Sequence, residues 1–236
     1  MFTIGIIGAM EQEIMLLRDR IQNSQTLILY QYTIHIGVLN DVNIVLLKSG
    51  VGKTAAAIST TLLISVFNPK IIINIGSAGL LVPTLHIGDI IICDEMCYHD
   101  VDVTSFGYQL GQIPDYPKSF FSDKKLVFLA EQVIKKLNLH AATGLIVTGD
   151  AFINDNKILK RIRNNFPQAI AVEMEATSIA QVCYQFNIPL LVIRAISDLA
   201  NQQSKLDFTK FLNLSVQQFS LVVEKILKTC YLIKSH

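Results

Sequence analysis

Runs of apolar and β-branched residues recur along the chain at the length of β-strands. Several of these runs are apolar on both faces, which is expected when helices cover both sides of a sheet. The pattern predicts strands over residues 2–7, 26–30, 33–38, 43–48, 70–75, 89–93, 141–148 and 189–196. We expect the strands between residues 26 and 48 to be antiparallel.

Other segments space their apolar residues as one face of a helix does. They predict helices over residues 53–67 and 124–137, the second starting from Ser122, and a helical face from Ala176 to Cys183. A long terminal helix is predicted from apolar positions between residues 208 and 226. Residues 1–236 are therefore interpreted as one α/β domain, with a central mixed β-sheet flanked by helices.

The composition supplies ample material for a core, because 51% of the 236 residues are hydrophobic and 17% are charged. The longest apolar stretches, 71–82 and 221–233, contain polar residues and fall short of the ~20 apolar residues that a bilayer requires. The N-terminus lacks the basic start of a signal peptide. A net charge of +1 gives no reason to expect nucleic acid or a membrane as partner.

Motifs for metals and nucleotide triphosphates are incomplete. The four cysteines show no framework spacing, so we expect reduced thiols in a cytoplasmic protein. Cys97 and His99 lie in an acidic segment, but their spacing fits no structural zinc site. Gly52 and Lys53 match the end of a phosphate loop, yet the position of its first glycine is Leu47. We therefore expect no metal and no cofactor, and a plain strand-to-helix turn at residues 49–54.

Two acids, Glu13 and Asp198, lie just after predicted strands, and a third, Glu175, lies where an apolar segment passes into a helix. Each one alone is most simply a helix cap, since acids in a first turn complement the helix dipole. Three of them together indicate a polar pocket, because ligands of α/β sheets bind beyond the carboxyl ends of the strands. Phe152, at another strand end, is either a core residue or a ring on which a base stacks. The small residues at 74–79 form either a structural turn or a close approach to a ligand.

Eight sequence words follow one another from Ile4 to about Ala200: IGIIGAMEQEI, SGVGKTAAA, NIGSAG, GDIII, YHDVDVTSFGYQLGQIP, TGDAFI, NFPQAIAVEMEA and RAISDLA. In this order they resemble the bacterial methylthioadenosine/S-adenosylhomocysteine nucleosidases of the purine nucleoside phosphorylase superfamily. The resemblance implies a nucleoside phosphorylase-like fold and a hydrolase that releases adenine from 5′-methylthioadenosine and S-adenosylhomocysteine, and also from 5′-deoxyadenosine. Such an enzyme serves methionine salvage and the recycling of S-adenosylmethionine by-products.

The resemblance also implies roles for the acids and their neighbours. Glu13 would activate the attacking water, and Asp198, held by Ser197, would protonate N7 of the leaving adenine. Glu175 would bind the ribose hydroxyls, with Met174 lying against the sugar. This division of labour agrees with the chemistry, because a departing base needs an acid and the water needs a base.

Further residues implied by the resemblance would recognise the base and sugar. Phe152 would stack on the adenine, and the backbone of Ile153 would read its edge. The residues expected to line the pocket near the purine and ribose are Ser77, Ala78 and Gly79.

Family members are homodimers, and the segment 103–114 resembles the loop that reaches into the neighbouring subunit's site. The residues expected at the partner's alkylthio pocket are Val103, Phe106, Tyr108 and Pro114. This chain departs from many relatives at Leu80, where they carry a second glycine; we expect this to change the loop shape and not the reaction.

Two alternatives remain at this point. A nucleoside phosphorylase would use phosphate in place of water, and phosphate recognition usually recruits arginine. Similar phosphorylases carry an arginine where this chain has Asn74, which favours hydrolysis. A hydrolase of another adenosine-like nucleoside, such as aminofutalosine, is a related alternative, because the sequence does not specify the 5′ pocket. The second alternative is a non-catalytic nucleoside-binding protein, which the presence of both Glu13 and Asp198 disfavours.

Overall fold

Ten strands join into one sheet within residues 2–201 and 204–234, the part of the chain that the computed structural model describes. They are β1 (Thr3–Gly8), β2 (Gln22–Leu29), β3 (Tyr32–Leu39), β4 (Val42–Lys48), β5 (Ile71–Leu80), β6 (Ile90–Tyr98), β7 (Phe120–Phe121), β8 (Ala141–Thr148), β9 (Ala169–Glu173) and β10 (Leu190–Asp198). Neighbours follow the order β10-β6-β8-β9-β5-β1-β4-β3-β2, and β7 pairs with β6.

Half of the sheet closes on itself. Because β10 pairs with both β6 and β5, the strands β5, β10, β6, β8 and β9 form a ring, while β1, β4, β3 and β2 extend from β5. The ring is completed where Gly79 and Leu80 of β5 pair antiparallel with Val172 and Ala171 of β9. The sheet is mixed, as predicted, and β3 pairs antiparallel with both β2 and β4.

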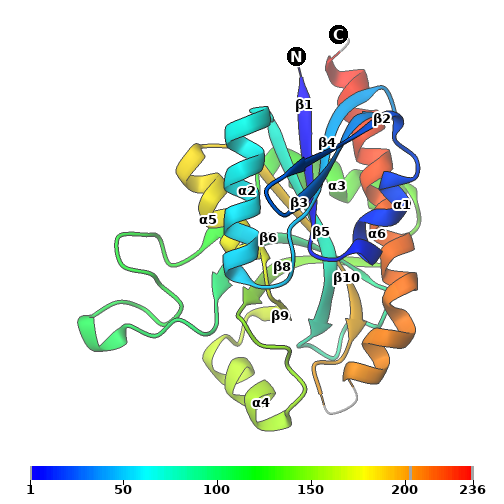
Figure 1. The fold of residues 1–236 in the computed structure, drawn as a ribbon. Coiled ribbons are helices and arrows are strands. Elements are labelled where there is room, and N and C mark those ends of the chain that lie inside the picture. Colours follow the sequence, from blue (N-terminus) through cyan, green and yellow to red (C-terminus); the bar gives the residue numbers. More distant parts are fainter. Residues whose placement is uncertain (1, 202–203, 235–236) are drawn as a thin grey trace.

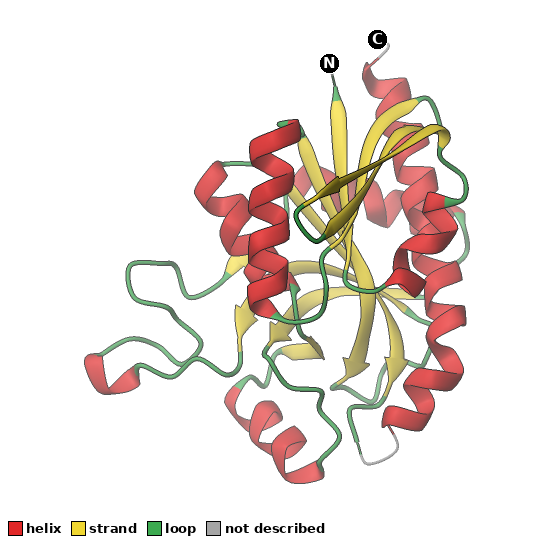
Figure 2. Ribbon diagram, viewed as in Figure 1, coloured by secondary structure: helices red, strands yellow, loops and turns green. Residues whose placement is uncertain are grey.

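Helices cover both faces of the sheet (Figures 1 and 2). They are α1 (Glu11–Arg18), α2 (Lys53–Phe67), α3 (Lys124–Lys136), α4 (Asn156–Asn165), α5 (Ala176–Phe186) and α6 (Ser204–Lys234), with a 3-10 turn η1 (Thr104–Phe106). One apolar cluster packs α1, α3 and α6 on one face, and a second packs α2 and α5 on the other. Within the described ranges, no helix combines the length and the apolar character needed to cross a membrane.

Alternation along the strands explains why they are apolar on both faces. Ile72 and Ile73 are neighbours on β5 and both are fully buried, but they belong to different clusters. Successive strand residues point to opposite faces, so each strand contributes to two cores. The α/β class with a mixed sheet is therefore confirmed.

The boundaries differ from prediction at several elements. Helix α2 and strand β8 match residues 53–67 and 141–148. The prediction that the third helix starts from Ser122 is wrong, because Asp123 caps α3 and the Ser122 hydroxyl instead donates to the carbonyl of Cys93 at 2.6 Å. Strand β5 continues to Leu80, so the small residues at 74–79 lie within the strand. β9 and α4 were not predicted.

Candidate active site

A cavity of about 430 Å³ opens beyond the carboxyl ends of β1, β5, β9 and β10, which is a suitable size for a small-molecule site. All the residues that the sequence predicted for the substrate pocket, apart from those expected at the partner's site, lie in or beside this cavity. Ile153 lines a smaller adjoining cavity of about 30 Å³ that shares Phe152 with the first. The others line the main cavity: Glu13, Ser77, Ala78, Gly79, Phe152, Met174, Glu175, Ser197 and Asp198.

Glu13 joins the start of α1 to β5. Its Oε2 accepts hydrogen bonds from the backbone N–H groups of Ala9 at 2.8 Å and Met10 at 3.1 Å. Its Oε1 accepts from the backbone N–H of Ser77 at 3.0 Å and from the Ser77 hydroxyl at 3.1 Å. A Cβ at residue 76 would lie 3.0 Å from Oε1, so Gly76 permits this approach. Glu13 is therefore both a helix-capping acid and a residue of the cavity.

Asp198 ends β10 and is buried. It accepts hydrogen bonds from the Ser197 hydroxyl at 3.0 Å and from the backbone N–H of Ala200 at 2.8 Å. Burial raises the pKa of Asp198, and these hydrogen bonds, with one from Ser204, oppose the rise only in part. A carboxyl group with a raised pKa retains its proton closer to neutrality and can act as an acid.

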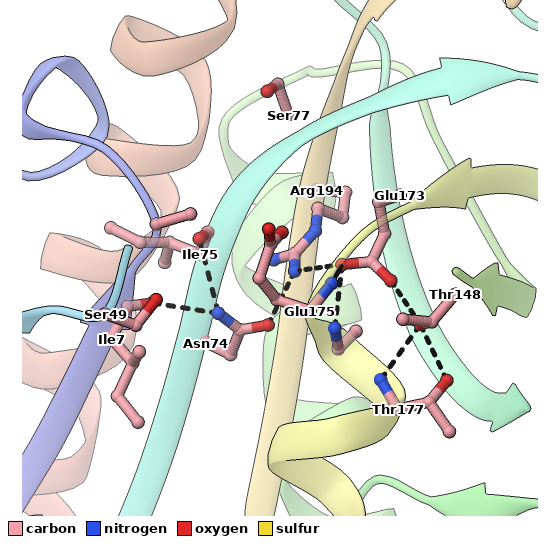
Figure 3. A network of polar contacts seen from close by, with 12 residues as sticks. Ile7, Ser49, Asn74, Ile75, Ser77, Thr148, Glu173, Glu175, Thr177 and Arg194 are labelled. Carbon is pink, nitrogen blue, oxygen red and sulfur yellow. Dashed lines mark hydrogen bonds and ion pairs between the residues drawn. The ribbon is translucent and has the colours of Figure 1, made fainter. Parts of the chain in front are cut away.

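The two acids Glu173 and Glu175 have different surroundings (Figure 3). Glu173 accepts hydrogen bonds from Arg194 at 2.8 Å, from the Thr148 hydroxyl and from two backbone N–H groups at the start of α5. In the described part of the chain, Glu175 accepts one hydrogen bond, at 2.7 Å from the N–H of Gly52. Burial and the charge of Glu173 raise the pKa of Glu175. Glu175 therefore has acceptor capacity left for a ligand, whereas Glu173 is saturated.

Arg194 is a residue of this region to which the sequence analysis gave no role. Its side chain is 1% exposed and forms an ion pair with Glu173 at 2.8 Å. The same nitrogen donates to the side-chain oxygen of Asn74 at 2.7 Å, and the Asn74 amide donates to the carbonyl of Ile7 at 2.9 Å. Within the described residues, Nε of Arg194 has no hydrogen-bond partner. A charged residue inside an otherwise apolar strand was the available sequence signal.

The cavity also has an aromatic wall. Phe152 is 43% exposed, so it is a cavity residue and not a core residue. Its ring meets that of Phe208 edge to face, with centroids 6.0 Å apart. The sequence placed Phe208 only on the apolar face of the terminal helix. The lining residues that the sequence did not identify are Ala9, Met10, Val51, Val172, Glu173, Lys205 and Phe208.

The segment after β6 projects away from the sheet (Figure 1). It carries the four residues expected at a partner's site, and the side chain of Phe106 is 80% exposed. The same four, all of them described, do not line the cavity of their own chain: Val103, Phe106, Tyr108 and Pro114. Within residues 2–201 and 204–234, no group of three or more His, Cys, Asp or Glu residues could hold a metal ion.

Residues 3–228 match the model of the Phosphorylase superfamily. The 5′-methylthioadenosine/S-adenosylhomocysteine nucleosidase of Neisseria meningitidis, solved with methylthio-immucillin-A, is 40% identical with a TM-score of 0.95, covering 97% of this chain and 100% of that one. The nucleosidase of Colwellia psychrerythraea 34H, solved with adenine, is 40% identical with a TM-score of 0.94, covering 96% and 94%. The futalosine hydrolase of Helicobacter pylori strain 26695 is 31% identical with a TM-score of 0.89, covering 95% and 98%.

Proposed function

This chain belongs to the Phosphorylase superfamily and, within it, to the 5′-methylthioadenosine/S-adenosylhomocysteine nucleosidases, and we propose that it hydrolyses the N-glycosidic bond of both nucleosides. The products are adenine and the 5-substituted ribose, and 5′-deoxyadenosine is a further substrate. The proposed place of the reaction is methionine salvage and the recycling of S-adenosylmethionine by-products.

The observation that carries the proposal is the placement of Glu13 and Asp198. Both carboxyl groups line one cavity, and they approach different points of β5. A Cβ at Gly76 would lie 3.0 Å from Glu13, and a Cβ at Gly79 would lie 3.0 Å from Asp198. Three residues along a strand span about 10 Å. A general acid that protonates the adenine and a general base that activates the water can therefore act from separate ends of one pocket.

In the proposed reaction the bond between C1′ and N9 breaks as Asp198 transfers its proton to N7 of the adenine. The positive charge that develops on the ribose is stabilised by the nearby Glu175 carboxylate, whose free acceptor positions also receive the ribose hydroxyls. A water molecule then attacks C1′ and gives a proton to Glu13. Ser197 orients Asp198 through its hydroxyl hydrogen bond at 3.0 Å.

The remaining lining residues are proposed to hold the base and sugar. Phe152 stacks on the adenine, the backbone of Ile153 recognises its edge, and Met174 lies against the ribose. The residues proposed to surround the purine and ribose are Ser77, Ala78 and Gly79. Met10 and Val51 add apolar surface to the lining, which suits a substrate with an alkylthio group.

We further propose a homodimer in which each site borrows side chains from the projecting segment of the partner. The exposed ring of Phe106 supports this, because a large apolar side chain on a projecting segment is unfavourable in water. Helices α2 and α5 lie on the side of the molecule from which the segment projects (Figure 1). They carry the exposed apolar residues Ile58, Val66 and Tyr184. The side chains proposed at the partner's site are Val103, Phe106, Tyr108 and Pro114.

The deciding experiment measures adenine release from a panel of 5′-substituted adenosines, with and without phosphate. We expect adenine and a reducing 5-thiosugar in phosphate-free buffer. A requirement for phosphate, with ribose 1-phosphate as product, would identify a phosphorylase. Binding without product would identify a nucleoside-binding protein. Because the futalosine hydrolase is 31% identical, the panel includes aminofutalosine. Exclusive cleavage of that nucleoside would contradict the proposed substrates.

A further inference from the structure

Beside the cavity, Lys53, Asp100 and Asp150 form a closed ring of contacts that the proposed reaction does not use. The Nζ atom of Lys53 lies 2.7 Å from Oδ2 of Asp100 and 3.8 Å from Oδ2 of Asp150. The backbone N–H of Asp150 donates to Oδ2 of Asp100 at 2.9 Å. The backbone N–H of Lys53 donates to Oδ1 of Asp150 at 2.7 Å. The ring therefore ties the first turn of α2 to the segments that follow β6 and β8.

This ring supplies the cap that α2 lacks. The N-cap residue is Gly52, which has no side chain, and the first turn contains no acid. Asp150 accepts the orphan N–H of Lys53 from a distant part of the chain, and its charge complements the helix dipole. Gly52 has φ +95°, and a Cβ there would lie 2.9 Å from Oδ1 of Asp150. Glycine is thus required both by the backbone conformation and by the close approach of Asp150.

The capped turn includes Gly52, whose backbone N–H donates a hydrogen bond to the active-site residue Glu175. The N–H of Gly52 donates to Oε1 of Glu175 at 2.7 Å, and Gly52 directly precedes Lys53. The Ser178 hydroxyl on α5 donates to the carbonyl of Lys53 at 2.7 Å, which holds the other side of the same turn. Glu175 is itself the N-cap residue of α5. The position of the donor on Glu175 therefore depends on how the start of α2 is held.

The ring lies in partly desolvated surroundings. The side chain of Lys53 is 23% exposed, and its ammonium lies 5.3 Å from the centroid of the Tyr98 ring. Burial raises the pKa of Asp100, but the hydrogen bonds from Lys53 and from the N–H of Asp150 outweigh it and leave that pKa lowered. The side chain of Asp150 is 49% exposed, so the shielded part of the ring is the pair of Lys53 and Asp100, which is a stronger constraint than an isolated surface ion pair.

We propose that Lys53, Asp100 and Asp150 are positioning residues of the active site, which hold the Gly52 N–H against the carboxylate of Glu175. The inference rests on the proposed function in one respect, namely that Glu175 receives the ribose hydroxyls. The hydrogen bond from Gly52 lowers the pKa of Glu175, and a loosened ring weakens this hydrogen bond. That pKa then rises further, and the carboxylate is less well aimed at the ribose.

The test compares Asp150→Ala and Lys53→Met with a matched control, Asp123→Ala. Asp123 caps α3 through the N–H groups of Lys125 at 2.9 Å and Leu126 at 3.1 Å, and it does not line the cavity. The substrates are 5′-methylthioadenosine and its 2′-deoxy analogue, assayed between about pH 5 and 9. The control therefore distinguishes the general effect of losing a helix cap from the effect of losing the cap that Asp150 provides to α2.

In the two ring variants we expect the acid limb of kcat/KM to move to higher pH. We also expect the preference for the ribose substrate over the deoxy analogue to fall at least about threefold, which is less than the full effect of one hydrogen bond to a charged group. Asp150→Asn retains an oxygen for the N–H of Lys53 and should lie between wild type and Asp150→Ala. Asp123→Ala should keep the wild-type limb and preference.

A second readout needs no substrate. The carboxyl carbon of Glu175, assigned by its absence in Glu175→Gln, is titrated by ¹³C NMR, and its pKa should be higher in the ring variants than in wild type. If Asp150→Ala does not fold, Lys53→Met and Asp150→Asn decide the question. Folded ring variants with the wild-type titration and the wild-type preference would overturn the inference. A wild-type enzyme that releases no adenine would overturn the proposed function alone, because the titration still tests the ring.

Discussion

The guanidinium of Arg194 donates to the side-chain oxygen of Asn74 across 2.7 Å, and both side chains are 1% exposed. The Asn74 amide uses its nitrogen for the carbonyl of Ile7, so both of its polar atoms are occupied. An arginine at position 74 would place two guanidinium groups side by side in a buried site. In the described part of the chain, the cation lining the cavity is Lys205. The arrangement thus favours water over phosphate as the nucleophile.

Replacement of Arg194 should expose the cost of a buried unpaired charge. Arg194→Met leaves Glu173 without its counterion, and we expect the free energy of unfolding to fall by about 3–5 kcal/mol. Urea unfolding measures the loss. The double variant Arg194→Met/Glu173→Gln removes both charges and should recover most of it. An equally unstable double variant would mean that packing, and not charge, is responsible.

Glu175 should make the stability of the protein depend on pH. Burial, followed by the charge of Glu173, raises its pKa above the ordinary 4.5. The folded state then retains a proton that the unfolded state releases, so stability falls as pH rises from about 4.5 through the raised pKa. Glu175→Gln lacks this loss, and at about pH 8 it should be more stable than wild type by at least about 1 kcal/mol, or about 2–4 °C in Tm.

The control for this effect is Glu131→Gln, because Glu131 is an exposed acid on α3. Thermal unfolding of wild type and both variants is compared at about pH 5 and about pH 8. The advantage of Glu175→Gln should grow with pH, whereas Glu131→Gln should follow wild type. An advantage that is the same at both pH values would show that the Glu175 carboxyl group does not titrate in this range.

If the proposed dimer forms, Tyr108 should affect substrate binding although it does not line the cavity of its own chain. Light scattering should give twice the mass of the chain. Tyr108→Ala should raise KM for thio-substrates about 10-fold, an apolar contact of about 1–2 kcal/mol, while kcat changes less. Tyr30→Ala is the control, since Tyr30 is an exposed tyrosine in the turn between β2 and β3, outside the projecting segment. A fully active monomer would contradict the dimer.

The convergence of Glu13, Glu175 and Asp198 could be predicted because each lies near the end of an apolar segment, and strand ends meet at one edge of an α/β sheet. The same reasoning located Phe152 but left its role open, since a strand-end aromatic can point inward or outward. The strand pattern also predicted a mixed sheet. These features depend on local periodicity and on one general rule of sheet architecture.

Other features depend on contacts between segments far apart in the chain. The pairing of Gly79 with Val172 closes the ring of strands, and nothing in either segment alone specifies it. Phe208 joins the cavity because the start of α6 packs beside Phe152. The cap of α2 comes from Asp150, 97 positions away, so no signal near residue 53 could reveal it. Strand β9 has five residues, and only Ile170 and Val172 among them are β-branched, so it does not stand out from its surroundings.

Glu13→Gln should impair both activity and stability. An amide cannot take a proton from water, so we expect kcat to fall by at least about 10²-fold. Its NH₂ group would also face donors, because Glu13 accepts from Ala9, Met10 and Ser77. The unfolding free energy should fall by about 1–3 kcal/mol. Glu11→Gln, an exposed acid in the same turn, is the control and should change neither quantity. Normal turnover in a folded Glu13→Gln variant would refute its role as base.

The strongest test of the mechanism is Asp198→Asn. Adenine departs poorly as an anion, so protonation of N7 lowers the barrier to bond cleavage. Asparagine keeps the size of the side chain and one oxygen, which can accept from Ala200 as one oxygen of Asp198 does, but it loses the second acceptor, which receives the Ser197 hydroxyl, and it cannot supply the same proton. We expect kcat to fall by at least about 10²-fold while substrate binding weakens much less, because the lost interaction belongs to the transition state.

The pH profile shows whether the loss concerns the proton. Burial raises the pKa of Asp198, and the protonated form is the active one, so wild-type kcat/KM should decline as pH rises through that pKa. Asp198→Asn has no proton to lose there and should show a flat residual rate across the same range. Ser197→Ala removes one of the hydrogen bonds that lower the pKa of Asp198, so it should shift the decline to higher pH, with a smaller loss of rate. Circular dichroism first establishes that each variant folds. If folded Asp198→Asn kept a near-normal kcat, or the same alkaline decline as wild type, Asp198 would be a structural cap and another group would protonate the adenine.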